Sequence, residues 1–250
     1  DSVADIVWRN TATGQVTIWM MNIGSIRSSV PSRIVHSDWK VAGVSDFNGD
    51  GKADILWRHS VHGYQAIWFM DYAVVQGEAY PATVNNIWKN AGVGDFNGDG
   101  KADILWRHDD GQFAIWLMNG ATKIGEAYPW LLGPNWKVES IADMNGDSRS
   151  DVLWRDTSSG QVHVSLMNGG VATEAPVGPV ALSWQIQGTG DFNRDGKADI
   201  VWRSTSNDLA IWYMNGGTNA GQGYFLNWRG QLRQVPTSFQ VIATPRSRRN

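Results

Sequence analysis

The sequence predicts an all-β fold, a five-bladed β-propeller with four-stranded blades. Three observations lead to this prediction. The segment Ala-Asp-Ile-Val-Trp-Arg at residues 4–9 recurs four times with small changes, at intervals of 48 or 49 residues. Short stretches rich in branched and aromatic residues alternate with Gly, Asn and Asp, which is typical of strands and turns. No long segment carries the apolar period of a helix, and four-stranded repeats of about 40 to 50 residues are typical of propellers.

Each repeat is expected to form four strands in the same order. A Trp-Lys or Trp-Gln segment precedes an Asp-Phe-Asn-Gly-Asp-Gly loop, and the Asp-Ile-Leu-Trp-Arg strand follows that loop. A third strand of the form Ala-Ile-Trp-x-Met-Asn-Gly comes next. The Asn-Gly dipeptide favours a type I′ hairpin turn, so a fourth strand should pair with the third. The repeats start near residues 5, 54, 103, 151 and 199.

Thirteen of the fifteen tryptophans follow the repeat. They occupy the Trp-Arg pair, the Ile-Trp-x-Met strand and the start of the first strand. Large aromatic rings bury much apolar area, so we expect these tryptophans to pack between neighbouring blades. Trp130 and Trp228 fall outside the pattern. The arginine of each Trp-Arg pair is expected to form inter-blade ion pairs or to donate hydrogen bonds to the backbone.

The two ends of the chain are expected to share one blade. Residue 1 enters the repeat just before the Trp-Arg strand, and residues 239–243 resemble a first strand, with Phe239 at the usual tryptophan position. Pairing of residues 239–243 with the opening segment would close the ring and leave no open sheet edge. Residues 1–250 are therefore expected to form a single propeller domain.

Composition excludes several classes of protein. The net charge is −3 and no basic stripe is present, which argues against a nucleic-acid partner. No stretch approaches the roughly 18 to 20 apolar residues of a membrane helix, so membrane insertion is not expected. No charged segment followed by an apolar one opens the sequence, so we expect no signal peptide within it. The absence of cysteine excludes disulfides and thiolate metal sites.

The Asp-Phe-Asn-Gly-Asp-Gly-Lys-Ala-Asp loop predicts a calcium site. It offers side-chain oxygens at positions 1, 3, 5 and 9, a main-chain carbonyl at position 7, and glycine at position 6 for a sharp turn. Hard calcium prefers such all-oxygen sites, and the loop's carboxylates repel one another unless a cation offsets them. The four copies predict about four structural calcium ions, held by Asp46, Asn48, Asp50, Lys52 and Asp54; Asp95, Asn97, Asp99, Lys101 and Asp103; Asp143, Asn145, Asp147, Arg149 and Asp151; and Asp191, Asn193, Asp195, Lys197 and Asp199.

Two of the five blades depart from this pattern. In the third loop Ser148 replaces the glycine at position 6, so that loop is expected to be the weakest. The opening blade retains Asp1 and Asp5, but Thr244, Pro245 and Arg246 stand where the other copies supply Asp and Asn. No ion is therefore expected there.

The loop followed by Ile-Leu-Trp-Arg resembles the FG-GAP/VCBS repeat family over essentially the whole chain. That family includes the propeller of integrin α subunits, many secreted bacterial proteins and a fungal propeller lectin. The resemblance implies a calcium-binding propeller from a secreted or cell-surface protein. It also implies that ligands engage the face opposite the calcium loops or the clefts between blades. The chain differs in having five repeats where seven is common, and in lacking an inserted domain.

The sequence gives little support to catalysis. Nucleophile-elbow, zinc-protease and phosphate-loop motifs are absent. Glu78 and Glu126 recur in the same Gly-Glu-Ala-Tyr-Pro segment of two blades, which argues for repetition rather than for an asymmetric acid and base. We therefore expect a protein that is not an enzyme.

Two kinds of binding module remain. The first is a lectin-like module that binds carbohydrate, including a multivalent glycan, because repeated shallow grooves suit weak repeated contacts. The second is a protein-interaction or adhesion propeller, or an accessory domain of a larger secreted protein. Aromatic rings beside polar groups suit sugars. The candidate ligand-binding residues are Trp130, Trp228, Tyr80, Tyr128, Tyr224, Glu78, Glu126, His59 and His108.

Overall fold

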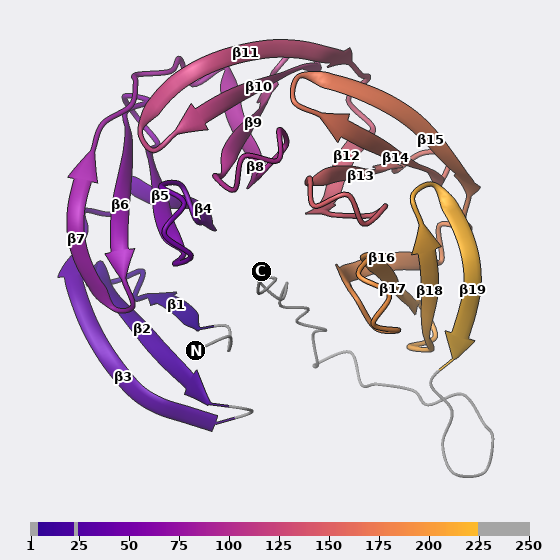
Figure 1. The fold of residues 1–250 in the computed structure, drawn as a ribbon, viewed down its shortest axis with the longest axis horizontal. Coiled ribbons are helices and arrows are strands. Elements are labelled where there is room, and N and C mark those ends of the chain that lie inside the picture. The colour runs from indigo at the N-terminus through magenta and orange to yellow at the C-terminus, as the bar shows by residue number, and fades with distance from the viewer. Residues whose placement is uncertain (1–4, 23–24, 225–250) are drawn as a thin grey trace. The chain divides into compact units, whose positions relative to one another are not determined.

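The computed structural model describes residues 5–22 and 25–224. Within these residues it contains nineteen strands, no helix and five antiparallel sheets, which are the blades of a β-propeller (Figure 1). The strands of each sheet follow one another in chain order. Two predictions lie outside the described residues: the strand at 239–243 and the candidate ligand residue Trp228.

Blade 1 has three described strands and the other blades have four. Blade 1 consists of β1 (Ile6–Arg9), β2 (Gln15–Asn22) and β3 (Ser25–Ile34). Blade 2 consists of β4 (Trp39–Ser45), β5 (Asp54–His59), β6 (Gln65–Asp71) and β7 (Val74–Ala79). Blade 3 consists of β8 (Trp88–Gly94), β9 (Asp103–His108), β10 (Gln112–Asn119) and β11 (Thr122–Leu131). Blade 4 consists of β12 (Trp136–Ala142), β13 (Asp151–Asp156), β14 (Gln161–Asn168) and β15 (Val171–Pro179). Blade 5 consists of β16 (Trp184–Gly190), β17 (Asp199–Ser204), β18 (Leu209–Asn215) and β19 (Thr218–Tyr224).

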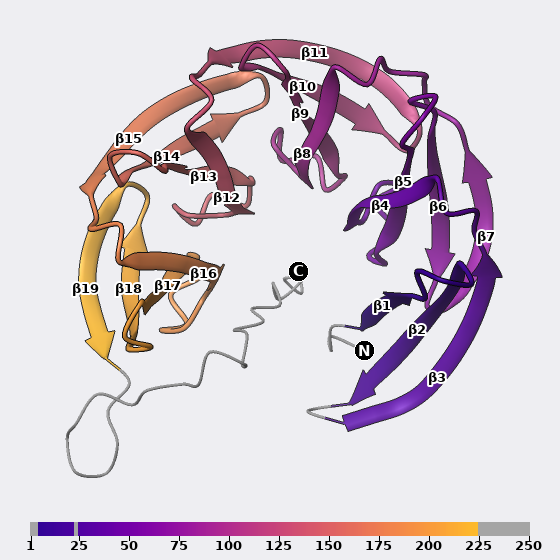
Figure 2. The same ribbon diagram turned by 180° about the vertical axis from the view of Figure 1, so that it is seen from behind.

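The chain divides into two compact units. Of the described residues, those up to 95 and those at 99–130 belong to unit 1, which therefore contains blades 1 to 3. The described residues at 96–98 and 131–224 belong to unit 2, which therefore contains blades 4 and 5. Seen from both sides, the last strand of each four-stranded sheet lies at the opposite edge from the first (Figures 1 and 2).

The apolar cores lie between neighbouring sheets. In unit 1 one core joins Val16 and Ile18 of blade 1 to Trp57 of blade 2, and another joins blades 2 and 3. In unit 2 a core joins Leu153 of blade 4 to Trp202 of blade 5. The predicted packing of the Trp-Arg tryptophans is confirmed in four blades, where Trp57, Trp106, Trp154 and Trp202 are each 1% exposed.

The arginine of the Trp-Arg pair joins one blade to the next. Arg58 donates to the carbonyls of Val84 (2.8 Å) and Trp88 (3.2 Å), at the start of blade 3, and its guanidinium lies 5.1 Å from the ring of Trp106. Arg155 likewise donates to the carbonyls of Ala181, ahead of β16, and of Trp184, its first residue, and lies 5.3 Å from the Trp202 ring. The expectation of backbone donation is thus confirmed. Each such arginine satisfies several otherwise unpaired carbonyls, which buried backbone requires.

Candidate ion loops and binding cleft

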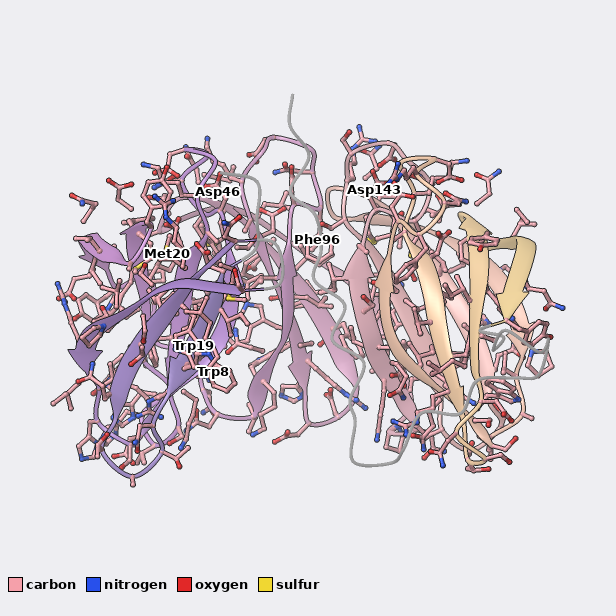
Figure 3. All side chains as sticks on the ribbon, turned by 90° about the horizontal axis from the view of Figure 1, so that it is seen from below. Trp8, Trp19, Met20, Asp46, Phe96 and Asp143 are labelled. Atoms are coloured by element: carbon pink, nitrogen blue, oxygen red, sulfur yellow. The ribbon has the colours of Figure 1, made fainter. Side chains whose placement is uncertain are left out.

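The aspartate at position 1 of each loop holds the turn together. Asp46 accepts hydrogen bonds from the N–H groups of Gly49 (2.6 Å) and Gly51 (2.7 Å). In the third loop Asp143, labelled with Asp46 in Figure 3, accepts from Ser148 (2.8 Å). Ser148 adopts a φ of +70°, close to the +80° of Gly51. The serine therefore preserves the shape of the loop that the sequence had suggested would be weakest.

The aspartate at position 9 ties the loop to the third strand. Asp54 is fully buried and accepts from the N–H of Phe47 (3.0 Å) in the loop and that of Met70 (2.8 Å) in β6. Asp151 is bound in the same way in blade 4. Burial raises the pKa of Asp151 to about 7, because desolvation penalises the charged carboxylate more than the two N–H donors favour it. Burial also raises the pKa of Asp54.

The donor chemistry of the loops fits calcium. Asn48 and Asp50 hold the middle of the first loop, where Asn48 Oδ1 accepts from the N–H of Asp50 (2.8 Å) and Asp50 Oδ1 accepts from that of Lys52 (2.9 Å). Every side chain offered is an oxygen ligand with lone pairs to spare. Within the described ranges, no three His, Cys, Asp or Glu side chains converge as a metal cluster. An ion here would therefore need the asparagine oxygen and main-chain carbonyls as well as carboxylates.

Successive loops within a unit are linked by the main chain. The carbonyl of Asp46, at position 1, accepts from the N–H of Ala102 (2.6 Å), at position 8 of the next loop. The same bond joins Asp143 to Ala198 (2.8 Å) in unit 2. The loops therefore brace one blade against the next.

A cleft of about 310 Å³ opens between blades 4 and 5. Pro179 to Ala181, on the connection between the blades, form one wall. Trp184, Trp202, Trp212, Gln222 and Tyr224 contribute most of the rest. Trp212 is half-buried and Tyr224 is 48% exposed, so their rings are accessible. The indole N–H of Trp202 is buried and has no acceptor among the described residues. The cleft thus combines accessible rings with an amide and an unused donor.

In blades 2 and 3 a cation lies over the ring of the tryptophan that is equivalent to Trp212. Arg33 lies 5.2 Å from the ring of Trp68 and pairs with Glu78 at 2.7 Å. Lys123 lies 4.7 Å from the ring of Trp116 and pairs with Glu126. The hydrogen bond from Lys123 lowers the pKa of Glu126. Tyr80 and Tyr128 flank these pairs and donate to Glu78 (3.2 Å) and Glu126 (3.3 Å) respectively.

The other candidate ligand residues lie apart from the cleft. Trp130 is 8% exposed and packs edge-on against Phe113 at 6.3 Å, so its ring is in the core rather than on the surface. The ring of His59 packs against Trp39 and that of His108 against Trp88. Of the eight candidates that the structure describes, only Tyr224 lines the cleft. Trp184, Trp212 and Gln222 were not predicted as ligand-binding residues from the sequence. The signal that could have found this site is the replacement of the charged Lys123 and Glu126 of one repeat by Asn219 and Gln222 in an otherwise similar segment of another.

Comparison with protein families identifies the repeat. A model of the FG-GAP-like repeat matches residues 46–106 and 143–202, and a model of the FG-GAP repeat matches residues 184–226. The chain belongs to the FG-GAP repeat family. FG-GAP propellers are typically non-catalytic binding domains and are common in extracellular proteins. This FG-GAP chain has the fold of a binding or interaction propeller.

Solved structures support the fold. The FG-GAP chain is similar to a chain of the Tc holotoxin pore from Photorhabdus luminescens (13% identity, TM-score 0.58), covering 97% of itself but 12% of that chain. It is also similar to a putative 6-phosphogluconolactonase from Bacteroides uniformis (11% identity, TM-score 0.53), covering 88% of itself and 66% of that chain. A luciferin-regenerating enzyme gives 8% identity and a TM-score of 0.51, with 88% and 72% coverage.

The sequence matches none of the curated proteins. Across the described residues, no helix has the length and apolar character needed to span a membrane.

Proposed function

We propose that this FG-GAP chain is a calcium-stabilised, non-catalytic module of a secreted or cell-surface protein, and that it binds carbohydrate. The observation that carries the proposal is the cleft of unit 2, in which Trp184, Trp212 and Tyr224 stand beside Gln222. No charged side chain lines this cleft among the residues described. An uncharged ligand is therefore favoured.

The chemistry of the cleft suits a saccharide. Aromatic side chains combine a large apolar surface with a polar edge, so the C–H face of a sugar ring can stack on Trp212. The amide of Gln222 offers both a donor and an acceptor to hydroxyl groups.

Calcium is assigned a structural part in this proposal. The four loops would hold it through the side chains at positions 1, 3, 5 and 9 and the carbonyl at position 7. When bound, the ion supplies a positive charge that offsets the carboxylates of each loop. The protein's own residues shape the loop, since Asp46 holds the turn and Asp54 anchors it to β6.

An array of neutral and acidic glycans, followed by calorimetry in solution, tests the function. We expect neutral saccharides to bind at micromolar to millimolar Kd, and Trp212→Ala to weaken binding at least tenfold. Trp116→Ala is the matched control, because Trp116 occupies the same strand position under a lysine. No binding to any glycan at millimolar concentration would overturn the proposal and favour a protein-interaction propeller. Equal loss in both variants would place the site elsewhere.

A further inference from the structure

The third and fourth strands of blades 2, 3 and 5 share a tryptophan at one position but differ in the charge of the residues beside it. In blade 2 Trp68 on β6 pairs with Glu78 on β7, and in blade 5 Trp212 on β18 pairs with Gln222 on β19. Blade 3 carries Thr-Lys-Ile-Gly-Glu-Ala-Tyr at residues 122–128, where blade 5 carries Thr-Asn-Ala-Gly-Gln-Gly-Tyr at 218–224. The three tryptophans therefore occupy equivalent positions, each facing the preceding blade of its unit.

In unit 1 the accessible face of this tryptophan is already occupied. Arg33 comes from β3 of the preceding blade, whereas Lys123 comes from β11 of the same blade, so two different segments supply the cation. Each cation is held by a glutamate and by the electrostatic attraction of the ring face. A sugar ring could not stack on Trp68 or Trp116 without displacing that cation.

In unit 2 both charged residues of this arrangement are replaced. Asn219 stands at the position of Lys123, and its side-chain oxygen accepts from the N–H of Gly221 (3.0 Å). The asparagine is thereby folded back onto its own strand. Gln222 stands at the position of Glu126 and has no negative charge to attract a cation. Among the described residues, no lysine or arginine stacks on Trp212, and the cleft lies open.

We infer that the chain closes the clefts at Trp68 and Trp116 with its own cations, and that Asn219 and Gln222 leave the unit 2 cleft open as a neutral-saccharide site. The cleft at Trp116 is a latent copy of this site, closed by Lys123 and Glu126. This inference rests on the proposed function and adds the reason why the site selects uncharged ligands. The side chains of Lys123 and Glu126 are 41% and 39% exposed, and exposed ion pairs contribute little to the stability of the fold. Their replacement should therefore leave the fold intact.

A reciprocal exchange tests the inference. The probe is the tightest-binding neutral saccharide of the array, titrated calorimetrically into the full chain. We expect the double variant Lys123→Asn/Glu126→Gln to bind one saccharide more per chain than the unaltered protein. The converse variant Asn219→Lys/Gln222→Glu should bind at least tenfold more weakly at the unit 2 cleft. Adding Trp116→Ala to the first double variant should return the stoichiometry to that of the unaltered protein, which shows that the gained site is at Trp116.

Each outcome separates the inference from the function on which it rests. An unchanged stoichiometry in Lys123→Asn/Glu126→Gln, or unchanged affinity in Asn219→Lys/Gln222→Glu, overturns the inference and leaves carbohydrate binding intact. Absence of binding in every variant overturns both proposals. Thermal melts of the variants, expected within a few degrees of the unaltered protein, exclude misfolding as the reason for a lost site. A collisional quencher provides a second measurement, because uncovering Trp116 should increase the quenching of tryptophan fluorescence.

Discussion

Blades 1 and 2 place equivalent residues in different surroundings. Trp57 is 1% exposed, whereas Trp8, at the same position of blade 1, is 47% exposed. Asp54 accepts two main-chain N–H groups, but within residues 5–22 and 25–224 Asp5 accepts one, from Met21 (2.8 Å). The second donor to Asp54 comes from the loop between β4 and β5, and blade 1 has no described counterpart of β4. Figure 3 shows Trp8 beside Trp19, with ring centroids 4.8 Å apart. Among the described residues, blade 1 therefore differs from blade 2 by one strand and by the loop that follows this strand.

We propose that residues 239–243 supply this inner strand to blade 1 and make the chain one domain. Deleting residues 237–250 should then remove a strand and expose the edge of β1, since open edges template aggregation. We expect loss of most soluble protein, whereas deletion of residues 246–250 should be nearly neutral. Soluble yield and thermal melting compare the two. Identical behaviour of the two truncations would contradict closure by this strand.

The number of bound calcium ions should distinguish blade 1 from blades 2 to 5. The loops of blades 2 to 5 predict four ions in a calorimetric titration, and blade 1 predicts none. An ion that binds only the folded state stabilises it by about 2.7 kcal/mol at a hundredfold excess over its Kd. Chelation should therefore lower the Tm by many degrees. An unchanged melt after exhaustive chelation would remove calcium from the proposal, and a fifth ion would show that blade 1 is not the exception.

The stability costs of Trp57→Ala and Trp8→Ala test whether further residues cover Trp8 in blade 1. Trp57→Ala should destabilise the protein by about 3 to 5 kcal/mol, the range for a buried aromatic residue. If the strand at 239–243 completes the blade and a neighbouring sheet covers Trp8, Trp8→Ala should cost nearly as much. Urea unfolding gives both values. A cost below about 1 kcal/mol for Trp8→Ala, typical of an exposed side chain, would mean that this ring stays at the surface.

The position 9 aspartates give the smallest and most local test. Asp54→Ala leaves the N–H groups of Phe47 and Met70 without their acceptor, and an unpaired buried donor costs about 1 to 3 kcal/mol. Asp5→Ala should lower the free energy of unfolding by about half as much if Met21 is the only N–H donor to Asp5. The two substitutions should have equal effects if a completed blade supplies a second donor to Asp5. Chemical denaturation in the presence of a chelator excludes any contribution from bound ions. A neutral Asp54→Ala would contradict the anchoring role inferred from the geometry.

The repeat made the architecture predictable, whereas the site depended on side chains far apart in the sequence. Asn-Gly turns and the Asp-Ile-Leu-Trp-Arg strand placed the hairpins correctly, because these signals are local. The pairing of Arg33 with Glu78 spans 45 residues and two blades, so no local pattern indicates it. Trp130 looked available because repeat packing does not require it. The structure buries it because blade 3 has Phe113 beneath, where blade 2 has Gln65 opposite Arg58.

A loop contacts the preceding loop through a different residue from the one that contacts the following loop, so the two sides of a repeat are not equivalent. The side chain of Lys101 passes over Gly49, leaving 3.3 Å to a Cβ built there, and that of Lys197 passes over Gly146 at the same distance. The fourth loop has Arg194 at this position, with a φ of +67°. A further copy joined after blade 5 would bring its own lysine against the Arg194 side chain, whereas a copy inserted after blade 2 or blade 4 would meet a glycine. Duplication or grafting of blades in this chain should therefore be better tolerated at those two junctions than next to Arg194.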